Sequence, residues 1–265
     1  MYGSKFTNVQ EKAKFFTIKV SPTIAANLQN AAATLTANDV VFDWTEFTLP
    51  NGAHRLVGVT VVAPPNASGA SQDFPLDLLF ATQTQGHGGV AAGSAPQSIG
   101  TVNSAALPTA SPYYNDLIGA VKIDATDFTD TEPRSVGVTG VAQGGMNPVL
   151  FTSYGNSFPT NGRFSFYVAA TTPSNPALKS GVTINESNFG AGTQTTITVA
   201  DVDAKKCFAP GDVLHAGDNA VLGTVSTITN ATTIVLTAAN TDACEDDDIL
   251  YNINPIDLIF TFERA

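Results

Sequence analysis

The feature that most constrains the fold is one strong strand pattern at the end of the chain. Residues 256–262 (IDLIFTF) have the composition of a strand with one apolar face. A strand on its own leaves its backbone polar groups and its apolar face unsatisfied. We therefore expect residues 256–262 to pair with a sheet that is built from the earlier part of the chain.

A turn-rich stretch precedes this strand. Within residues 207–251, short β-rich runs alternate with turn residues at 210–212 (PGD), 217–219 (GDN) and 229–230 (TN). This pattern predicts a small β unit that is inserted before the last strand.

The earlier part of the chain is also rich in strand patterns. Residues 40–49 (VVFDWTEFTL) would place Val41, Asp43, Thr45 and Phe47 on one face, and Val40, Phe42, Trp44 and Glu46 on the other. A turn at residues 50–52 separates this run from the next, and Asn161-Gly162 is a strong hairpin signal. Further strands are expected at residues 14–20, 55–62, 74–81, 118–123, 136–141, 149–151, 163–169, 181–184 and 195–199.

Many short strands with regular turns indicate an all-β protein. We expect a jelly-roll-like two-sheet β-sandwich, with a small β-barrel domain inserted before the last strand. The predicted division is a flexible N-terminal arm at residues 1–13, a sandwich at 14–190 plus 253–265, and a small barrel at 191–252. Residues 21–37 are Ala-rich, and Ile24, Leu28, Ala31 and Leu35 fit one face of a helix that Ser21 and Pro22 would begin. An irregular pair of strands is the alternative for this segment.

The net charge of the chain limits the kinds of partner that it is expected to bind. The formal net charge is −11, and charged residues make up 13% of the chain, against roughly 25% in ordinary soluble domains. An acidic surface repels phosphate backbones and anionic lipid, so we expect neither a nucleic-acid partner nor a membrane partner. The N-terminal residues contain no apolar core of a secretory signal, and no run of about 18 apolar residues occurs.

The chain has two cysteines, Cys207 and Cys244, both in the small unit. Without a signal peptide we expect two reduced thiols. A disulfide that closes the unit is the alternative, formed once the protein leaves a reducing compartment. Neither cysteine has a histidine at the spacing of a zinc site.

No catalytic pattern is present in the sequence. His54, His87 and His215 are widely separated, and we interpret each as a surface or loop residue. The sequence lacks a G-x-S-x-G elbow and a P-loop lysine. The Gly-rich segment at residues 85–96 has no strand-to-helix context, which favours a flexible loop. We therefore expect no enzyme activity and no cofactor.

Two further groups of residues are candidates for binding. Asp246, Asp247 and Asp248 lie in an acidic turn and are candidate calcium ligands, although their spacing does not match an EF-hand and a solvated turn is the simpler interpretation. Tyr113, Tyr114, Tyr154 and Trp44 could stack on sugars, but the strand pattern around Trp44 favours a core position.

Several segments together resemble virion structural proteins of tailed bacteriophages of the marine and cyanophage type. They are KFFTIKV, DVVFDWTEF, RLVGVTVV, PLDLLFA, SIGTVNSA, DLIGAVKI and FSFYVAA. The segment PGDVLHAGDNAVLGTVSTITNATTIVLT is similar to small β-barrel modules of phage capsid and tail proteins. The resemblance covers most of residues 14–262 and consists of a pattern of strands and turns.

The resemblance implies a structural protein of the phage particle. Our first hypothesis is a decoration (cement) protein on the outer capsid surface, with the major capsid protein as partner and a homotrimer as the assembly. The expected contact residues lie in the N-terminal arm and the Gly-rich loop: Phe6, Thr7, Asn8, Val9, Gln85, His87 and Val90. The alternatives are a tail, fibre or collar component that binds host glycans, and a free carbohydrate-binding module.

Overall fold

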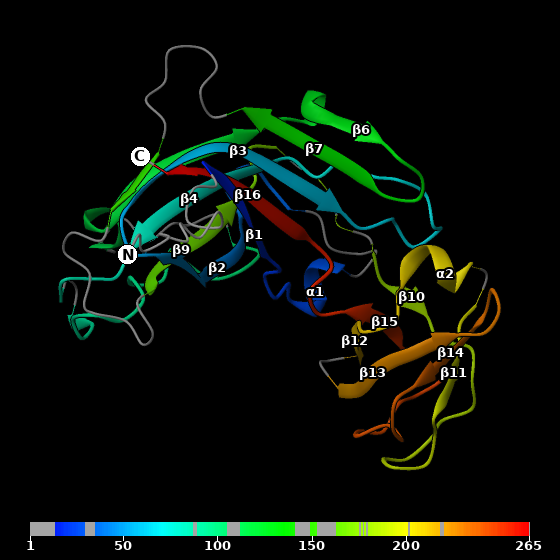
Figure 1. Cartoon of the computed structure of the whole chain (residues 1–265). Coiled ribbons are helices and arrows are strands. Elements are labelled where there is room, and N and C mark those ends of the chain that lie inside the picture. The colour runs from blue at the N-terminus through cyan, green and yellow to red at the C-terminus, as the bar shows by residue number, and fades with distance from the viewer. Residues whose placement is uncertain are drawn as a thin grey trace, which may run out of the picture.

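The computed structural model shows two β domains joined by two chain crossings (Figure 1). It describes residues 14–29, 35–86, 89–104, 112–140, 149–152, 163–174, 176, 178, 180–200, 202–217 and 220–264. The predicted arm at residues 1–13 lies outside these ranges.

The larger domain consists of two stacked antiparallel sheets (Figure 1). Within the described ranges, the first sheet has the order β1-β16-β3-β7-β6, and β8 also pairs with β3. The second sheet has the order β2-β9-β4-β5. The first sheet is formed by β1 (Phe15–Val20), β16 (Asp257–Arg264), β3 (Ala53–Ala63), β7 (Ser135–Gly140), β6 (Phe128–Asp130) and β8 (Leu150–Thr152). The second is formed by β2 (Val40–Pro50), β9 (Arg163–Thr171), β4 (Leu76–Thr82) and β5 (Leu117–Ile123).

The order of these strands is that of a jelly roll. The principal strands in chain order are β1, β2, β3, β4, β5, β7, β9 and β16. The first sheet contains the first, eighth, third and sixth of them, and the second contains the second, seventh, fourth and fifth. This interleaving is the double Greek key of the jelly roll. The predicted fold class is confirmed.

The last strand completes the first sheet, as expected. In β16, Phe260 pairs with Ile18 of β1 on one side and with Val59 of β3 on the other. Because β16 is paired on both sides, it joins β1 to the rest of the first sheet.

Phenylalanine rings join the two sheets of the sandwich. The ring centroid of Phe47 in β2 lies 5.4 Å from that of Phe260 in β16 and 5.9 Å from that of Phe151 in β8. Phe80 and Phe166 of the second sheet contact the same group. All of these rings are buried, and each contributes about 1.5–3 kcal/mol of burial free energy.

Strand β2 departs from the strict alternation that its sequence predicted. Val41, Phe42 and Phe47 all belong to the main core, and the register of β2 against β9 shifts between Val40 and Phe42 and again between Phe42 and Thr45. Irregularities of this kind change which side chains face inward. They leave Trp44 only partly buried, in a separate small cluster, so its predicted core position was wrong.

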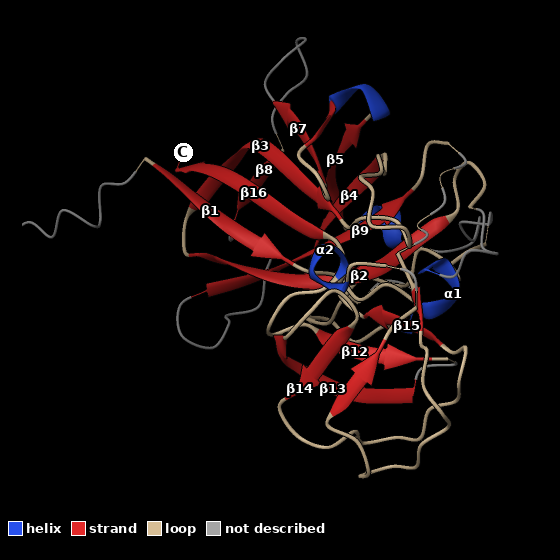
Figure 2. Cartoon of the chain, turned by 90° about the vertical axis from the view of Figure 1, so that its right-hand side faces the viewer, coloured by secondary structure: helices blue, strands red, loops and turns tan. Residues whose placement is uncertain are grey.

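The smaller domain is a sheet curled round its own core (Figure 2). In the described part of the chain its strand order is β10-β15-β12-β13-β14-β11. A bridge between Ile184 and Val199 links the two ends of this order, which makes the sheet barrel-like. Its elements are β10 (Val182–Thr183), β11 (Thr196–Thr198), α2 (Ala204–Cys207), β12 (Val213–Ala216), β13 (Ala220–Ile228), β14 (Thr233–Leu236) and β15 (Ile249–Asn252).

Two predicted boundaries differ from the structure. The small domain begins near Val182, earlier than the expected residue 191, because β10 pairs with β15 and Val182 and Ile184 are part of the small core. The helix expected from residue 21 begins at Ala26, and its described part, α1, spans Ala26–Gln29. Ile24, Leu28 and Leu35 are nevertheless buried in the main core, as their spacing predicted.

Candidate functional site: the joint and groove between the domains

Gln29 of α1 forms the centre of the joint between the domains. Its side chain is fully buried. Nε2 donates to the carbonyl oxygens of Ile24 (3.2 Å) and Asn252 (2.9 Å), and Oε1 accepts from the Ser180 hydroxyl at 2.8 Å. A buried amide with partners for both of its ends holds a single arrangement, because an unpaired end would carry the full desolvation cost.

Both chain crossings are also tied to α1 and its flank through the backbone. Gly181 N donates to Gln29 O at 3.0 Å, and Ile24 N donates to Ile253 O at 2.8 Å. A Cβ on Gly181 would overlap Ile249 Cγ2 and would lie 3.1 Å from Gln29 O. A glycine is therefore required at this close approach of the two domains.

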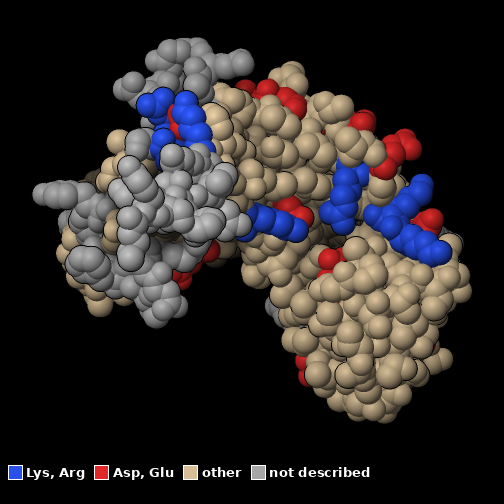
Figure 3. Space-filling view, viewed as in Figure 1, with Lys and Arg blue, Asp and Glu red and all other residues tan. Residues whose placement is uncertain are grey.

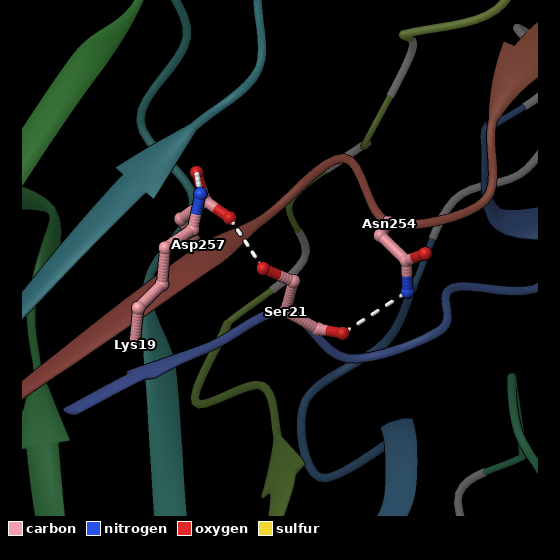
Figure 4. A network of polar contacts seen from close by, with 4 residues as sticks. All are labelled: Lys19, Ser21, Asn254 and Asp257. Carbon is pink, nitrogen blue, oxygen red and sulfur yellow. Dashed lines mark hydrogen bonds and ion pairs between the residues drawn. The ribbon is translucent and has the colours of Figure 1, made fainter. Parts of the chain in front are cut away.

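A groove of about 470 Å³ lies between the domains. Figure 4 shows the polar network on its sandwich side. Ser21 Oγ donates to Asp257 Oδ1 at 2.6 Å, Asn254 Nδ2 donates to Ser21 O at 3.0 Å, and Lys19 Nζ lies 2.8 Å from Asp257 Oδ2. The groove is lined by Lys19, Ser21, Val62, Arg134, Ala209, Pro210, Gly211, Asp212, Val213, Asn252, Asn254, Pro255 and Asp257.

The charges in this groove have both signs. Figure 3 shows Lys and Arg side chains along the notch between the domains, and Lys19 and Arg134 line the groove itself. Across it, burial raises the pKa of Asp212, while its hydrogen bond from Ala209 N (2.8 Å) and the charge of Arg134 act in the opposite direction. The ion pair between Lys19 and Asp257 lies within the sandwich, whereas Arg134 and Asp212 are opposite charges that line the groove from the two domains.

The predicted contact residues are only partly within the described ranges. Phe6, Thr7, Asn8, Val9 and His87 lie outside them. Gln85 is exposed, and its Nε2 donates to Gln83 O at 3.4 Å. Val90 is partly exposed.

The described part of the Gly-rich segment is held by hydrogen bonds. Thr84 N donates to Ser94 O at 3.0 Å, and Gly93 N donates to Thr84 O at 2.9 Å. Ile99, which follows, is fully buried against Val40 and Ala169. These are tertiary contacts that the local sequence does not reveal, and the flexibility expected for the loop stays a prediction.

The carboxylates of Asp246 and Asp248 in the acidic turn accept hydrogen bonds from backbone N–H groups. Asp248 Oδ2 accepts from Glu245 N at 2.9 Å, and Asp246 Oδ1 accepts from Glu186 N at 3.1 Å. Asp247 occupies the left-handed region with a φ of 66°. Among the described residues, no three acidic, histidine or cysteine side chains are grouped as a metal site would require. The Asp248 carboxylate therefore stabilises the turn itself, and the Asp246 carboxylate joins the turn to the segment that contains Glu186.

Both cysteines are buried free thiols. Burial raises the pKa of Cys207 to about 11. Burial, together with the Asp248 carboxylate at 3.4 Å from its Sγ, raises the pKa of Cys244 to about 12. Thiols with such values are poor nucleophiles at neutral pH.

His54 is a buried residue, contrary to the surface or loop position predicted for it. Its Nε2 lies 2.9 Å from Pro50 O, and its ring meets that of Phe16 edge-on at 5.2 Å. Burial lowers the pKa of His54, and the charge of Arg264 adds to this effect. The tight turn between β2 and β3 places the imidazole in a buried position next to the ring of Phe16.

Comparisons with known proteins add little. No family model matches the chain, and no curated protein matches it. Among solved structures, the crystal structure of the STIV MCP matches with 10% identity over 95% of this chain and 96% of that chain, at a TM-score of 0.15. The atomic structure of Sulfolobus turreted icosahedral virus matches with 9% identity over 95% and 90%, at a TM-score of 0.12. Because similarity at these TM-scores is too low to argue from, the fold assignment rests on the strand order.

Within the described ranges, no helix is both long and apolar enough to cross a membrane.

Proposed function

We propose that the chain is a structural protein of a virus particle, and within it a decoration protein on the outer surface of a phage head. The observation that carries this proposal is the jelly-roll strand order of the larger domain, an architecture that viral capsid domains use. The segments that resemble phage virion proteins include β1, β2, β3, β4, β5 and β9 of this jelly roll.

Charge supports a position on the outside of the shell. A chain of net charge −11 is repelled by the packaged nucleic acid, and its partner in this proposal is the major capsid protein. The protein acts without catalysis, by adding buried contact area across the joints between capsid subunits. At about 25 cal/mol per Å² of apolar area, contacts repeated over a shell sum to a large stabilisation, part of which the cost of association offsets.

The joint between the domains fits this mechanical role. Two crossings and a buried glutamine connect the small barrel to the sandwich, and a polar groove lies between the two domains. Because two chain segments connect the small barrel to the sandwich, the barrel cannot rotate about one connecting segment. A force applied to the barrel is therefore transmitted to the sandwich. We propose a homotrimer as the assembled form.

The copy number of the protein per particle tests the proposal. Quantitative mass spectrometry of purified particles is expected to find it in proportion to the major capsid protein, and light scattering of the isolated protein is expected to give the mass of a trimer. A few copies per particle would contradict the decoration role and support the tail. Absence from the particle would overturn the virion proposal, and a monomer would overturn the trimer.

A tail, fibre or collar component that binds glycans is the second candidate. The observation in its favour is that Trp44, Tyr113 and Tyr114 form one row of rings, with successive centroids 6.4 Å and 6.1 Å apart. Labelled antibody in electron microscopy of whole particles separates this candidate from the first, since it would mark the tail and leave the head bare.

A further inference from the structure

A second groove lies beside β2 and shares only Ser21 with the described lining of the groove between the domains. Its volume is about 610 Å³, within the range of roughly 300–1,000 Å³ that is usual for small-molecule sites. Its walls offer hydroxyl groups, one carboxylate and one large aromatic ring. It is lined by Ser21, Thr23, Ala25, Asp43, Trp44, Thr45 and Val102.

Trp44 provides an anchored aromatic wall of this groove. Its Nε1 donates to Gln97 O at 2.8 Å, and the ring packs against the small cluster that contains Val40 and Ile99. The indole is thus held in place while it still lines the groove. An anchored ring loses little conformational entropy when a ligand stacks on it.

The aromatic row extends outward from Trp44. Tyr113 lies beside it, and Tyr114, beyond Tyr113, is 59% exposed. The negative π-face of such rings attracts the slightly positive C–H groups of a sugar ring.

Asp43 provides a fixed hydrogen-bond acceptor next to the ring. Its Oδ1 accepts from Trp44 N at 2.9 Å and from Ile99 N at 3.2 Å. These two bonds set the orientation of the carboxylate, and no residue in the described part of the chain donates to Oδ2. A negative acceptor without a nearby cation in the lining favours neutral hydroxyl donors and disfavours anionic ligands.

We propose that this groove binds a neutral pyranose unit of a glycan. The apolar face of the sugar stacks on Trp44, and its hydroxyl groups donate to Asp43 Oδ2 and bond with Thr23 and Thr45. Tyr113 and Tyr114 contact the next unit of the chain of sugars. The inference does not depend on the position of the protein in a virus particle, because it rests on the groove alone.

The chain contains a single tryptophan, so fluorescence reports on this groove specifically. The intact protein is titrated with the methyl glycosides of glucose, galactose, mannose and N-acetylglucosamine, and with the methyl glycoside of glucuronic acid as an anionic probe. We expect a saturable change in Trp44 fluorescence with at least one neutral glycoside, and none with the glucuronic acid glycoside. Saturation-transfer NMR on the same samples is expected to show the sugar C–H protons in contact with the protein.

Two variants test the residues of the site. Asp43→Asn keeps an oxygen for the two backbone N–H groups but replaces the free acceptor, and is expected to weaken binding roughly tenfold. Tyr114→Ala is expected to weaken binding of a disaccharide more than that of its monosaccharide. Asp203→Asn is the matched control, because Asp203 also holds a backbone N–H (Lys205 N, 3.1 Å) but lies in the small domain, and it is expected to bind as the wild type does.

The inference is overturned if neither fluorescence nor NMR detects any of the neutral glycosides. It is equally overturned if binding is unchanged in both Asp43→Asn and Tyr114→Ala, or if the glucuronic acid glycoside binds best. The copy number of the protein in a particle has no bearing on any of these outcomes, so failure of this site and failure of the proposed function are distinguishable.

Discussion

The hydroxyl of Ser180 donates to the side-chain oxygen of Gln29 across 151 residues of sequence, at 2.8 Å and in a buried environment. The same Gln29 amide bonds Asn252 on the return crossing. One side chain thus joins the outgoing crossing, the return crossing and α1.

Replacement of Gln29 is expected to loosen this joint. Gln29→Ala leaves the Asn252 and Ile24 carbonyls and the Ser180 hydroxyl without their partner, which costs on the order of 2–3 kcal/mol. Urea unfolding measures the loss. Gln194→Ala, which alters a half-buried glutamine of the small domain, is the control and should change the midpoint little. Equal effects in the two variants would contradict the role assigned to Gln29.

Gly181 is expected to tolerate no side chain. In Gly181→Ala the new methyl group meets Ile249 and the carbonyl of Gln29, and overpacking of this kind costs about 1–3 kcal/mol. At Gly190 the nearest atom to a new Cβ is 3.9 Å away, so Gly190→Ala should lie within about 0.5 kcal/mol of the wild type. Thermal unfolding of Gly181→Ala and Gly190→Ala compares a closely packed glycine with one that has space around it. Similar melting temperatures of the two variants would contradict the prediction.

Phe47 is expected to be a dominant core residue. Phe47→Ala removes a ring that contacts Phe80, Phe151, Phe166, Phe260 and Phe262, with an expected loss of about 3–5 kcal/mol. Phe15 is 54% exposed, so Phe15→Ala is the matched control and should cost far less. Chemical denaturation followed by circular dichroism measures both. A loss at Phe15 as large as that at Phe47 would place the core elsewhere.

His54 is expected to make the protein less stable in mild acid. Its pKa in the folded protein is lower than the ordinary value of 6.5, so the unfolded chain binds the proton more readily. The stability linked to His54 is complete above pH 6.5 and is lost as the pH falls through the folded pKa. His54→Gln should lose less stability than the wild type between neutral and mildly acidic pH, as measured by urea midpoints. Parallel losses in the two proteins would contradict this prediction.

The two thiols are expected to be inert in the folded protein. With pKa values raised to about 11 for Cys207 and about 12 for Cys244, almost no thiolate is present near neutral pH. Iodoacetamide should label neither cysteine in native buffer and both in guanidinium chloride, as seen by mass spectrometry. Labelling of either cysteine in the native protein would show that the thiol is accessible. Failure of iodoacetamide to label the unfolded protein without reductant would show that the two cysteines are not free thiols.

Local sequence patterns were sufficient to predict the positions of the main strands and the fold class. The runs at 40–49, 55–62 and 163–169 became β2, β3 and β9, each within two residues of its expected ends. The lone pattern at 256–262 required a partner sheet, and β16 is paired on both sides. A two-residue period is a local property of a strand, so a linear sequence states it directly.

Other features could not be obtained in this way. Residues 182–190 have no signal that assigns them to the small domain, and only the pairing of β10 with β15 does so. Nothing near Gln29 in the sequence predicts its bonds to Ser180 and Asn252. The aromatic residues Trp44 and Tyr113 were identified as candidates one by one, but the register shifts in β2 and the return of the chain at Tyr113 brought them together.

The sequence by itself therefore determined which segments are strands, that a terminal strand closes an earlier sheet, and that the surface is acidic. Tertiary structure alone decided the position of the joint, the burial of His54 and the groove beside Trp44. The physical reason is distance along the chain. Alternation and turn chemistry act over a few residues, whereas a joint or a groove depends on the packing of side chains that lie far apart in sequence.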